Sequence, residues 1–313
     1  METAMYDLIP QGFIPLDKWI QAAIEWMAYN LRPLFQTIKW PVETLLYWIE
    51  RGLQATPPVI FVAAVAALAW RLAGRGVGIF CLISMLAILF IGIWPETMTT
   101  LALIATAIVI CVVIGIPIGI WCARNDRVWN VVRALLDIMQ TTPSFVYLIP
   151  VVMLFGVGTV PGAVAVIVVA VPPLIRFTNL GIRMVDRELI EAGVAFGATD
   201  RQILWEVQLP QAMPTILGGL NQTVLMAMVM SVIVAMIGAE GLGLVVLQGL
   251  GRLDIGRAAV GGIGIVLMAI MLDRLTQALA NRETGQNYRS GFGTWWRRVF
   301  TSAPKEKAAP AEN

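Results

Sequence analysis

Charged residues are scarce in this sequence. Asp, Glu, Lys and Arg make up only 13% of its 313 residues, while 58% are hydrophobic and the mean hydropathy is +0.78. A soluble domain carries roughly 25% charged residues, about twice this share. Because so few charges cannot cover a water-facing surface of ordinary size, the composition excludes a soluble enzyme and a disordered chain. It indicates a protein that crosses a membrane several times.

Histidine is absent and cysteine is rare. Without imidazole the chain has no histidine metal site, no Ser-His catalysis and no histidine proton relay. The three cysteines, Cys81, Cys111 and Cys122, lie in apolar runs without Cys-x-x-Cys spacing and are typical of small core residues. No Gly-Lys pair occurs, so the sequence lacks the phosphate-binding loop that would bind ATP. The net charge of +2 excludes a nucleic-acid binder that relies on bulk positive charge.

The uncharged stretches predict an all-α bundle of about seven transmembrane helices, since one crossing needs about 20 apolar residues. A glycine-rich turn at 156–162 separates two shorter helices within 138–175. The last helix reaches full length if it begins near Ile255. The predicted spans are 52–70, 76–95, 97–123, the two within 138–175, 207–239 and 255–272.

Basic residues set the predicted orientation. If the segment 176–212 faces the cytoplasm, most of the 22 Lys and Arg residues fall on the inner side, and the outer side keeps Lys18, Arg32, Lys39, Arg51, Arg252 and Arg257. The N-terminus is then outside and the C-terminus inside. We predict that residues 1–55 form two amphipathic helices on the outer leaflet, the second with Pro41 in its first turn. Residues 56–280 form the transmembrane domain, and 281–313 form a cytoplasmic tail.

The segment 186–212 is too strongly patterned for a simple linker between spans. Apolar and small residues share one helical face of its first half, and Gly197 stands where a glycine is expected just after a helix. Thr199 or Asp200 can cap a second helix that ends before Pro210. We therefore predict a short, partly apolar helix pair that faces the cytoplasm and inserts into a groove on another protein.

The same segment resembles the signature Glu-Ala-Ala-x3-Gly-x9-Ile-x-Leu-Pro of the permease subunits of ABC-type importers. Its positions are occupied, with the spacing intact, by Glu191, Ala192, Gly193, Gly197, Val207, Leu209 and Pro210. Gly193 and Val207 depart mildly from Ala and Ile, and glycine costs roughly 1 kcal/mol of helix stability against alanine. The runs 140–145, 209–216 and 249–256 look like the glycine betaine/proline betaine branch, and the resemblance covers about residues 95–280.

This resemblance implies the type I ABC importer permease fold and a transport subunit that is not itself an enzyme. It implies that the segment 186–212 is a coupling loop, which docks on a separate cytoplasmic ATPase that holds ATP and Mg²⁺. An extracytoplasmic binding protein would deliver the substrate, and a second permease copy, most economically in a homodimer, would complete the pathway in a bacterial inner membrane. The implied cargo is a compatible solute used in osmoprotection, such as glycine betaine or a related quaternary amine. Choline, carnitine, proline or another small solute remain alternatives.

Polar residues within apolar runs are candidates for the translocation path, because unpaired polar groups in lipid are costly. These candidates are Thr141, Thr142, Ser144, Asn221, Gln222, Thr223 and Ser231. Their hydroxyls alternatively bond within their own helix, and the amides alternatively join two helices. No carboxylate lies in the middle of a predicted span, which favours a zwitterionic, overall neutral solute over a metal cation or phosphate. The run 238–243 is predicted as an external turn or gate.

Two other classes compete with an importer subunit. An intramembrane enzyme without histidine needs a Ser-Lys pair or paired aspartates, and the predicted spans hold neither. An autonomous channel or secondary transporter would be expected to carry charged ion-coupling residues in mid-span, and it would leave the patterned segment 186–212 without a role.

Overall fold

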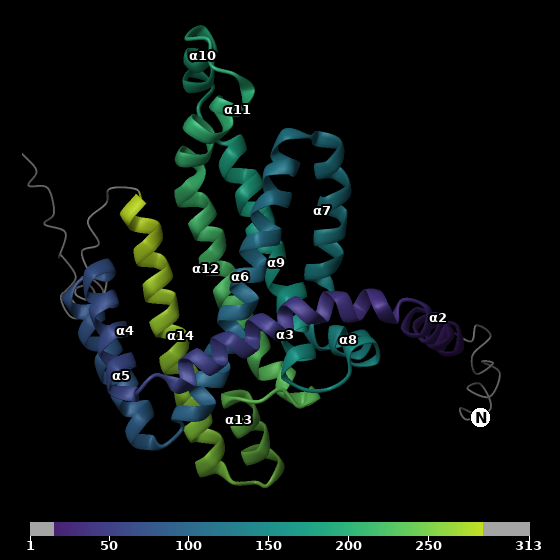
Figure 1. Ribbon diagram of the computed structural model, residues 1–313, viewed down its shortest axis with the longest axis vertical. Helices are drawn as coiled ribbons and strands as arrows, with labels where there is room; N and C mark the ends of the chain where they lie inside the picture. Colours follow the sequence, from purple (N-terminus) through teal and green to yellow (C-terminus); the bar gives the residue numbers. More distant parts are fainter. Residues whose placement is uncertain (1–15, 284–313) are drawn as a thin grey trace, which may run out of the picture.

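The computed structural model describes residues 16–283, and the predictions for residues 1–15 and for the tail from 284 onward lie outside that range. Within it every regular element is helical (Figure 1). The α-helices are α2 (Leu16–Asn30), α3 (Arg32–Ala55), α4 (Pro58–Ala73), α5 (Arg75–Ile91), α6 (Trp94–Arg124), α7 (Asp126–Thr141), α8 (Leu148–Phe155), α9 (Thr159–Arg183), α10 (Arg187–Ala195), α11 (Asp200–Gln202), α12 (Leu209–Ile233), α13 (Leu242–Gly251) and α14 (Ile255–Glu283). Further segments are the 3-10 helices η1 (Ser144–Tyr147) and η3 (Val234–Ile237) and the π-helix η2 (Ile203–Gln208).

The described residues hold fewer candidate spans than the sequence predicts. Four helical stretches are long and apolar enough to cross a membrane: Trp94–Arg124, Thr159–Arg183, Asp200–Ile237 and Ile255–Ala280. Two bent helix pairs raise the number to at most six. The stretch predicted as the span 76–95 is α5, which is apolar but only 17 residues long. The prediction of an all-helical bundle with several membrane spans is confirmed, and the described residues hold four to six candidate spans where about seven were predicted.

Two bends at prolines explain much of the difference between the predicted spans and the candidate spans of the structure. The chain turns by 106° between Asp126–Thr141 and Ser144–Phe155, so the predicted helix within 138–155 is not one straight span. Thr142 precedes Pro143 and is extended, with ψ +129°. A second bend of 105° separates α3 from α4, where Thr56 before Pro57 is extended with ψ +124°. A proline disfavours the helical conformation of the residue before it, which ends both helices at these points.

Helices α6, α9 and α12 form the centre of the bundle (Figure 1). Small residues let their backbones approach closely, as is common where membrane helices pack together. A β-carbon at Gly119 of α6 would lie 2.5 Å from Cβ of Thr178 in α9. A β-carbon at Gly219 of α12 would lie 2.5 Å from Cβ of Phe177 in α9. Glycine at these two crossings therefore sets the spacing of the three helices.

The N-terminal helices α2 and α3 run across the bundle rather than along it (Figure 1). Helix α3 buries Val42 and Leu46, and the two helices expose the aromatic residues Trp19, Trp26, Trp40, Tyr47 and Trp48. Their location on the outer leaflet stays a prediction. Pro41 lies inside α3, which begins at Arg32, so its predicted place in the first turn was wrong. Pro33 holds that place.

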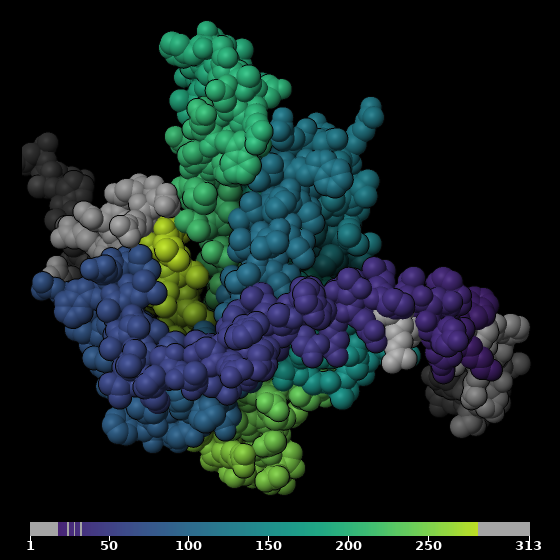
Figure 2. Space-filling view, in the orientation of Figure 1, coloured from purple at the N-terminus to yellow at the C-terminus, as the bar shows by residue number. Residues whose placement is uncertain are grey.

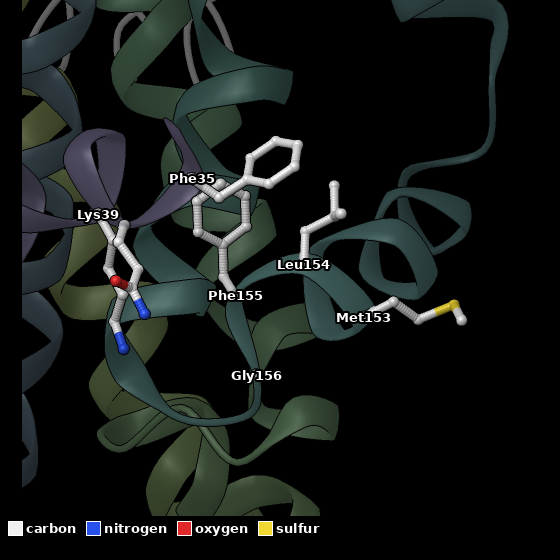
Figure 3. A pocket seen from close by; sticks show the side chains of 7 residues that line it. Phe35, Lys39, Met153, Leu154, Phe155 and Gly156 are labelled. Atoms are coloured by element: carbon white, nitrogen blue, oxygen red, sulfur yellow. The ribbon is translucent and has the colours of Figure 1, made fainter. Parts of the chain in front are cut away.

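A cavity of about 430 Å³ lies where α3 meets the end of α8 (Figure 3). It is lined by Phe35, Gln36, Lys39, Met153, Leu154, Phe155 and Gly156. The rings of Phe35 and Phe155 meet edge to face, with their centroids 5.5 Å apart. This aromatic contact joins the N-terminal helices to the bundle.

Candidate functional site

A helix pair projects beyond the rest of the molecule, at the top of Figures 1 and 2. It consists of α10, the turn that follows it, and the start of the long helix that becomes α12. Helix α9 continues to Arg183, so the connecting segment is shorter than the predicted loop from residue 176. Glu191 and Ala192 on α10 are exposed, and the side chain of Phe196 is 93% exposed. The pair therefore presents apolar surface that the rest of the described chain, residues 16–283, does not cover.

Gly197 makes the turn of this helix pair. Its φ is +81°, a left-handed conformation that suits glycine. The N–H of Ala198 donates to the carbonyl of Gly193 at 3.0 Å, and the N–H of Gly197 donates to that of Val194 at 2.9 Å. These two bonds form a Schellman motif, which satisfies carbonyls at the end of α10. The prediction that Gly197 directly follows the first helix is confirmed.

Thr199 begins the second helix of the pair. Its backbone N–H donates to Oε1 of Gln202 at 2.9 Å, and its Oγ1 accepts the backbone N–H of Gln202 at 3.4 Å. The two residues form a capping box. Of the two predicted caps, Thr199 and Asp200, the structure selects Thr199.

The second helix does not end before Pro210, and that prediction was wrong. The helical stretch runs from Asp200 to Ile237, through the π-helix Ile203–Gln208. Pro210 lies in the first turn of α12, directly after the π-helix, where its missing N–H is tolerated. The π-helix adds a residue to the turn and shifts the hydrogen-bond ladder, so that the N–H of Leu209 donates to the carbonyl of Leu204. The projecting pair is thus continuous with α12.

The two helices of the pair pack on each other through apolar side chains. Ile203 and Leu204 are buried, whereas the side chain of Trp205 is 54% exposed. A β-carbon at Gly193 would lie 3.6 Å from Cγ1 of Ile203, which is an ordinary contact distance. Alanine would therefore fit at Gly193, and the departure from the importer signature is not required by packing. Val207 and Leu209 are half-buried at the base of the pair.

Ion pairs near the same end hold α7 on α9. Nη2 of Arg176 lies 2.6 Å from Oδ1 of Asp137, and Nη2 of Arg183 lies 2.7 Å from Oδ1 of Asp126. Nη2 of Arg183 also donates to the carbonyl of Cys122 in α6, at 2.9 Å. Arg176, which the sequence places in the loop, therefore lies within α9.

Most hydroxyls proposed for the translocation path bond within their own helix. Oγ1 of Thr141 donates to the carbonyl of Asp137, that of Thr142 to Ile138, and Oγ of Ser231 to Met228. Thr141, Thr142 and Ser144 lie at the bend after α7 rather than at the start of a straight span. The hydroxyl of Thr223 is buried and has no hydrogen-bond partner among the described residues.

Asn221 joins α12 to α14. Its Nδ2 donates to Oδ1 of Asp273 at 3.2 Å, and its Oδ1 accepts from the hydroxyl of Thr276. Nε2 of Gln277 donates to both oxygens of Asp273, at 2.7 and 2.8 Å. Asp273 lies in the last third of the candidate span Ile255–Ala280, just beyond the predicted span 255–272. The spacing of residues 273, 276 and 277 indicates that they share one face of a helix, but it does not reveal their partner Asn221 on α12. Gln222 is half-buried and makes no side-chain hydrogen bond to α14 among the described residues.

We expect Asn221→Leu to lower the free energy of unfolding by about 1–3 kcal/mol, since it removes one hydrogen bond to the carboxylate of Asp273 and one from the hydroxyl of Thr276. Gln222→Leu, the same change at the neighbouring half-buried amide, is the matched control and should cost less. Thermal unfolding of the purified variants in detergent measures both. Equal losses for the two variants would contradict a specific role of Asn221.

The family model for the binding-protein-dependent transport system inner membrane component matches residues 115–285, more than half of the chain. The chain is 50% identical over 288 residues to the glycine betaine/proline betaine transport system permease protein ProW of Escherichia coli K12, covering 92% of this chain and 81% of ProW. It is 43% identical over 271 residues to the glycine betaine transport system permease protein OpuAB of Bacillus subtilis 168, covering 87% of this chain and 95% of OpuAB.

Two solved structures, both inward-facing forms of the MetNI methionine ABC transporter, have similar folds. One aligns with a TM-score of 0.55 at 24% identity, covering 64% of this chain and 97% of that chain. The other aligns with a TM-score of 0.51 at 28% identity, covering 63% and 95%. The fold therefore defines a multi-pass transport subunit with the type I ABC importer permease architecture. The chain belongs to the family of binding-protein-dependent transport system inner membrane components, and within it to the permease subunits of ABC importers.

Proposed function

We propose that this permease imports glycine betaine or a related quaternary amine, driven by a separate cytoplasmic ATPase that acts through α10. Relatives that align over most of the chain are named for glycine betaine, proline betaine and carnitine. The observation that carries the coupling role is the projecting helix pair, because its exposed apolar residues are continuous with a core helix. Such a pair suits insertion into a groove of a partner protein.

Movement of the ATPase reaches the bundle through the second helix of the pair. Leu189 and Val194 of α10, with Phe196 directly after it, are exposed here and enter the groove of the ATPase. ATP binding closes the ATPase pair and carries the two α10 helices of a permease homodimer toward each other. Because the helix runs unbroken from Asp200 to Ile237, the displacement passes along α12 into the centre of the bundle. The bundle then rocks between inward and outward access. ATP and Mg²⁺ stay on the ATPase.

The polar cluster between α12 and α14 supports a neutral, zwitterionic cargo. Asp273 accepts hydrogen bonds from the amides of Asn221 and Gln277, so its carboxylate is already satisfied within the protein. It is therefore not an open site for a metal cation. Selection of the quaternary ammonium group by an aromatic cage then belongs to the binding protein.

Reconstitution tests the proposed function. We expect proteoliposomes with the permease, its ATPase, its binding protein and internal or external ATP to accumulate radiolabelled glycine betaine. Omitting either the ATPase or the binding protein should reduce uptake to that of empty liposomes. Competition by choline, carnitine and proline ranks the alternative solutes. Uptake that persists with the permease alone would identify a secondary transporter instead.

A further inference from the structure

Two adjacent prolines lie inside the central helix α9 (Figure 1). Pro172 and Pro173 are both buried, and the helix continues through them. A proline has no backbone N–H, so the carbonyls of Val168 and Val169, four residues earlier, lose their usual partners within the helix. Sharp kinks in long helices occur at such places. Helix α9 is therefore easier to bend at this point, in the middle of the bundle, than elsewhere along its length.

The end of α9 that follows the prolines is fixed to α6 and α7. Arg176 forms an ion pair with Asp137 in α7, and Arg183 forms one with Asp126 at the start of the same helix. Nη2 of Arg183 also donates to the carbonyl of Cys122 in α6, at 2.9 Å. This half of α9 is therefore expected to move as one unit with α6 and α7.

The end of α9 that precedes the prolines is attached to the segment after α12. The backbone N–H of Gly158, directly before α9, donates to the carbonyl of Ile237 at 2.9 Å. The backbone N–H of Glu240 donates to Oγ1 of Thr159, the first residue of α9, at 3.1 Å. The two ends of α9 therefore have different attachments, and the prolines lie between them.

Thr223 of α12 lies level with the proline pair. A β-carbon at Gly219 of α12 would lie 2.5 Å from Cβ of Phe177 in α9, and one at Gly181 of α9 would lie 3.0 Å from Cβ of Thr215 in α12. The two helices are therefore antiparallel. One helical turn beyond Gly219 brings Thr223 to the height of residues 170–173.

The hydroxyl of Thr223 has no hydrogen-bond partner among the described residues, although the residue is fully buried. By contrast, the hydroxyls of Thr97, Thr100 and Thr106 each donate to the carbonyl four residues earlier. A buried hydroxyl without a partner is unfavourable, and its presence calls for an explanation. Threonine side chains are among the groups that satisfy the carbonyls freed by a proline in a membrane helix. Thr223 therefore provides a donor for α9 in a second arrangement of the helices.

We propose that α9 bends at Pro172 and Pro173 during transport, and that the hydroxyl of Thr223 donates to a carbonyl freed by these prolines in the bent state. Movement of α12 carries the first half of α9 with it, while the second half stays with α6 and α7. The proposal rests on the proposed function, because it takes α12 as the helix that the ATPase displaces.

The first test replaces both prolines together, Pro172→Ala with Pro173→Ala, in the importer reconstituted with its ATPase and binding protein. Uptake of radiolabelled glycine betaine should fall at least about tenfold, because alanine restores the two N–H donors and stiffens the helix. The melting temperature of the permease should stay the same or increase for the same reason. Loss of uptake together with a lower melting temperature would assign the prolines to folding and overturn the hinge.

Pro117→Ala is the matched control. Pro117 also lies inside a long helix, α6, but it is exposed. This variant should keep the wild-type rate of uptake. Undiminished uptake by the double alanine variant, or an equal loss in Pro117→Ala, would overturn the hinge. If the wild-type importer shows no ATP-driven uptake, the proposed function fails, and the hinge fails with it.

Thr223→Val removes the hydroxyl and keeps the shape of the side chain. Uptake should fall by about two- to tenfold, the effect of one hydrogen bond lost from the bent state. The melting temperature should not fall, because the hydroxyl has no partner in the conformation described here. Thr106→Val is the control, since Thr106 is equally buried but bonds within its own helix, and it should keep its uptake. A lower melting temperature with full uptake in Thr223→Val would overturn the role of Thr223.

Spin labels at the two ends of α9 measure the bend directly. Val157 and Met184 flank the helix and are 72% and 66% exposed, whereas Cys81, Cys111 and Cys122 are buried, so labels on Val157→Cys and Met184→Cys are selective. An excess of unlabelled permease keeps each measured distance within one chain. The distance should differ between the importer without nucleotide and the importer trapped with ADP and vanadate, and the double alanine variant should abolish the difference. Equal distances in the two states of a wild-type importer that takes up solute would overturn the hinge and leave the proposed function standing.

Discussion

A Gly197→Val variant is expected to insert into the membrane normally and to lose about tenfold or more of its ATP-driven uptake. The φ of Gly197 is +81°, and a β-branched residue in this region is strained by roughly 1–3 kcal/mol. About 1.4 kcal/mol corresponds to a factor of ten in the population of the correct turn. A β-carbon here would meet no atom within 4 Å, so the effect comes from the backbone and not from crowding.

The strained turn changes the orientation of α10 relative to α12, while both helices remain intact. The ATPase then continues to hydrolyse ATP, but its movement no longer reaches the bundle. Uptake and ATP hydrolysis measured in the same proteoliposomes report this uncoupling as a fall in the ratio of solute moved to ATP consumed.

Glu191→Ala, which removes an exposed carboxylate from α10, should lower the same ratio.

Gly197→Asn is the matched control for the valine variant. Asparagine tolerates the left-handed conformation far better than valine, so this variant should keep most of its uptake. If valine and asparagine had equal effects, the conformation of the turn would not be the cause. If valine left coupling unchanged, α10 would have no role in transmitting the movement of the ATPase.

Much of the projecting helix pair could be predicted because its signals are local. A glycine just after a helix and a Thr-x-x-Gln capping box each act within one turn of the chain, and the structure has both at Gly197 and Thr199. The long apolar helices follow from composition in the same way. These features depend on neighbours in sequence, so one sequence is enough to find them.

The sequence-based predictions were wrong where the surrounding structure overrides a local rule. Pro210 was expected to end a helix. The helix instead continues, because Pro210 lies in the first turn of α12, directly after a π-helix, where its missing N–H is tolerated. Pro41 was expected to begin a helix, but α3 continues through it on the surface of the bundle. Asp273 was placed beyond the last span because the predicted spans are uncharged stretches, whereas in the structure the packing of α12 on α14 brings Asn221 within hydrogen-bonding distance of it. Contacts between distant segments are not visible in spacing alone.

A Gly119→Val variant is expected to lose most of its folded population, with an unfolding free energy lower by about 3 kcal/mol or more. A β-carbon at Gly119 would lie 2.5 Å from Cβ of Thr178 and 3.0 Å from the carbonyl oxygen of Ile175. Neither atom can move aside independently, since one belongs to the backbone of α9 and the other to a wholly buried, β-branched side chain. Helices α6 and α9 must separate to admit valine, and the close packing between them is lost.

Gly218→Val is the matched control, because a β-carbon at Gly218 of α12 meets no atom within 4 Å. Both positions are helical and the substitution is identical, so the intrinsic preference of valine for the helix cancels between them. Thermal unfolding in detergent, together with the yield of protein that elutes as a single species, should separate the two variants clearly. Similar stabilities would mean that the α6–α9 crossing is loose enough to take a branched side chain. In that case glycine would not set the spacing of these helices.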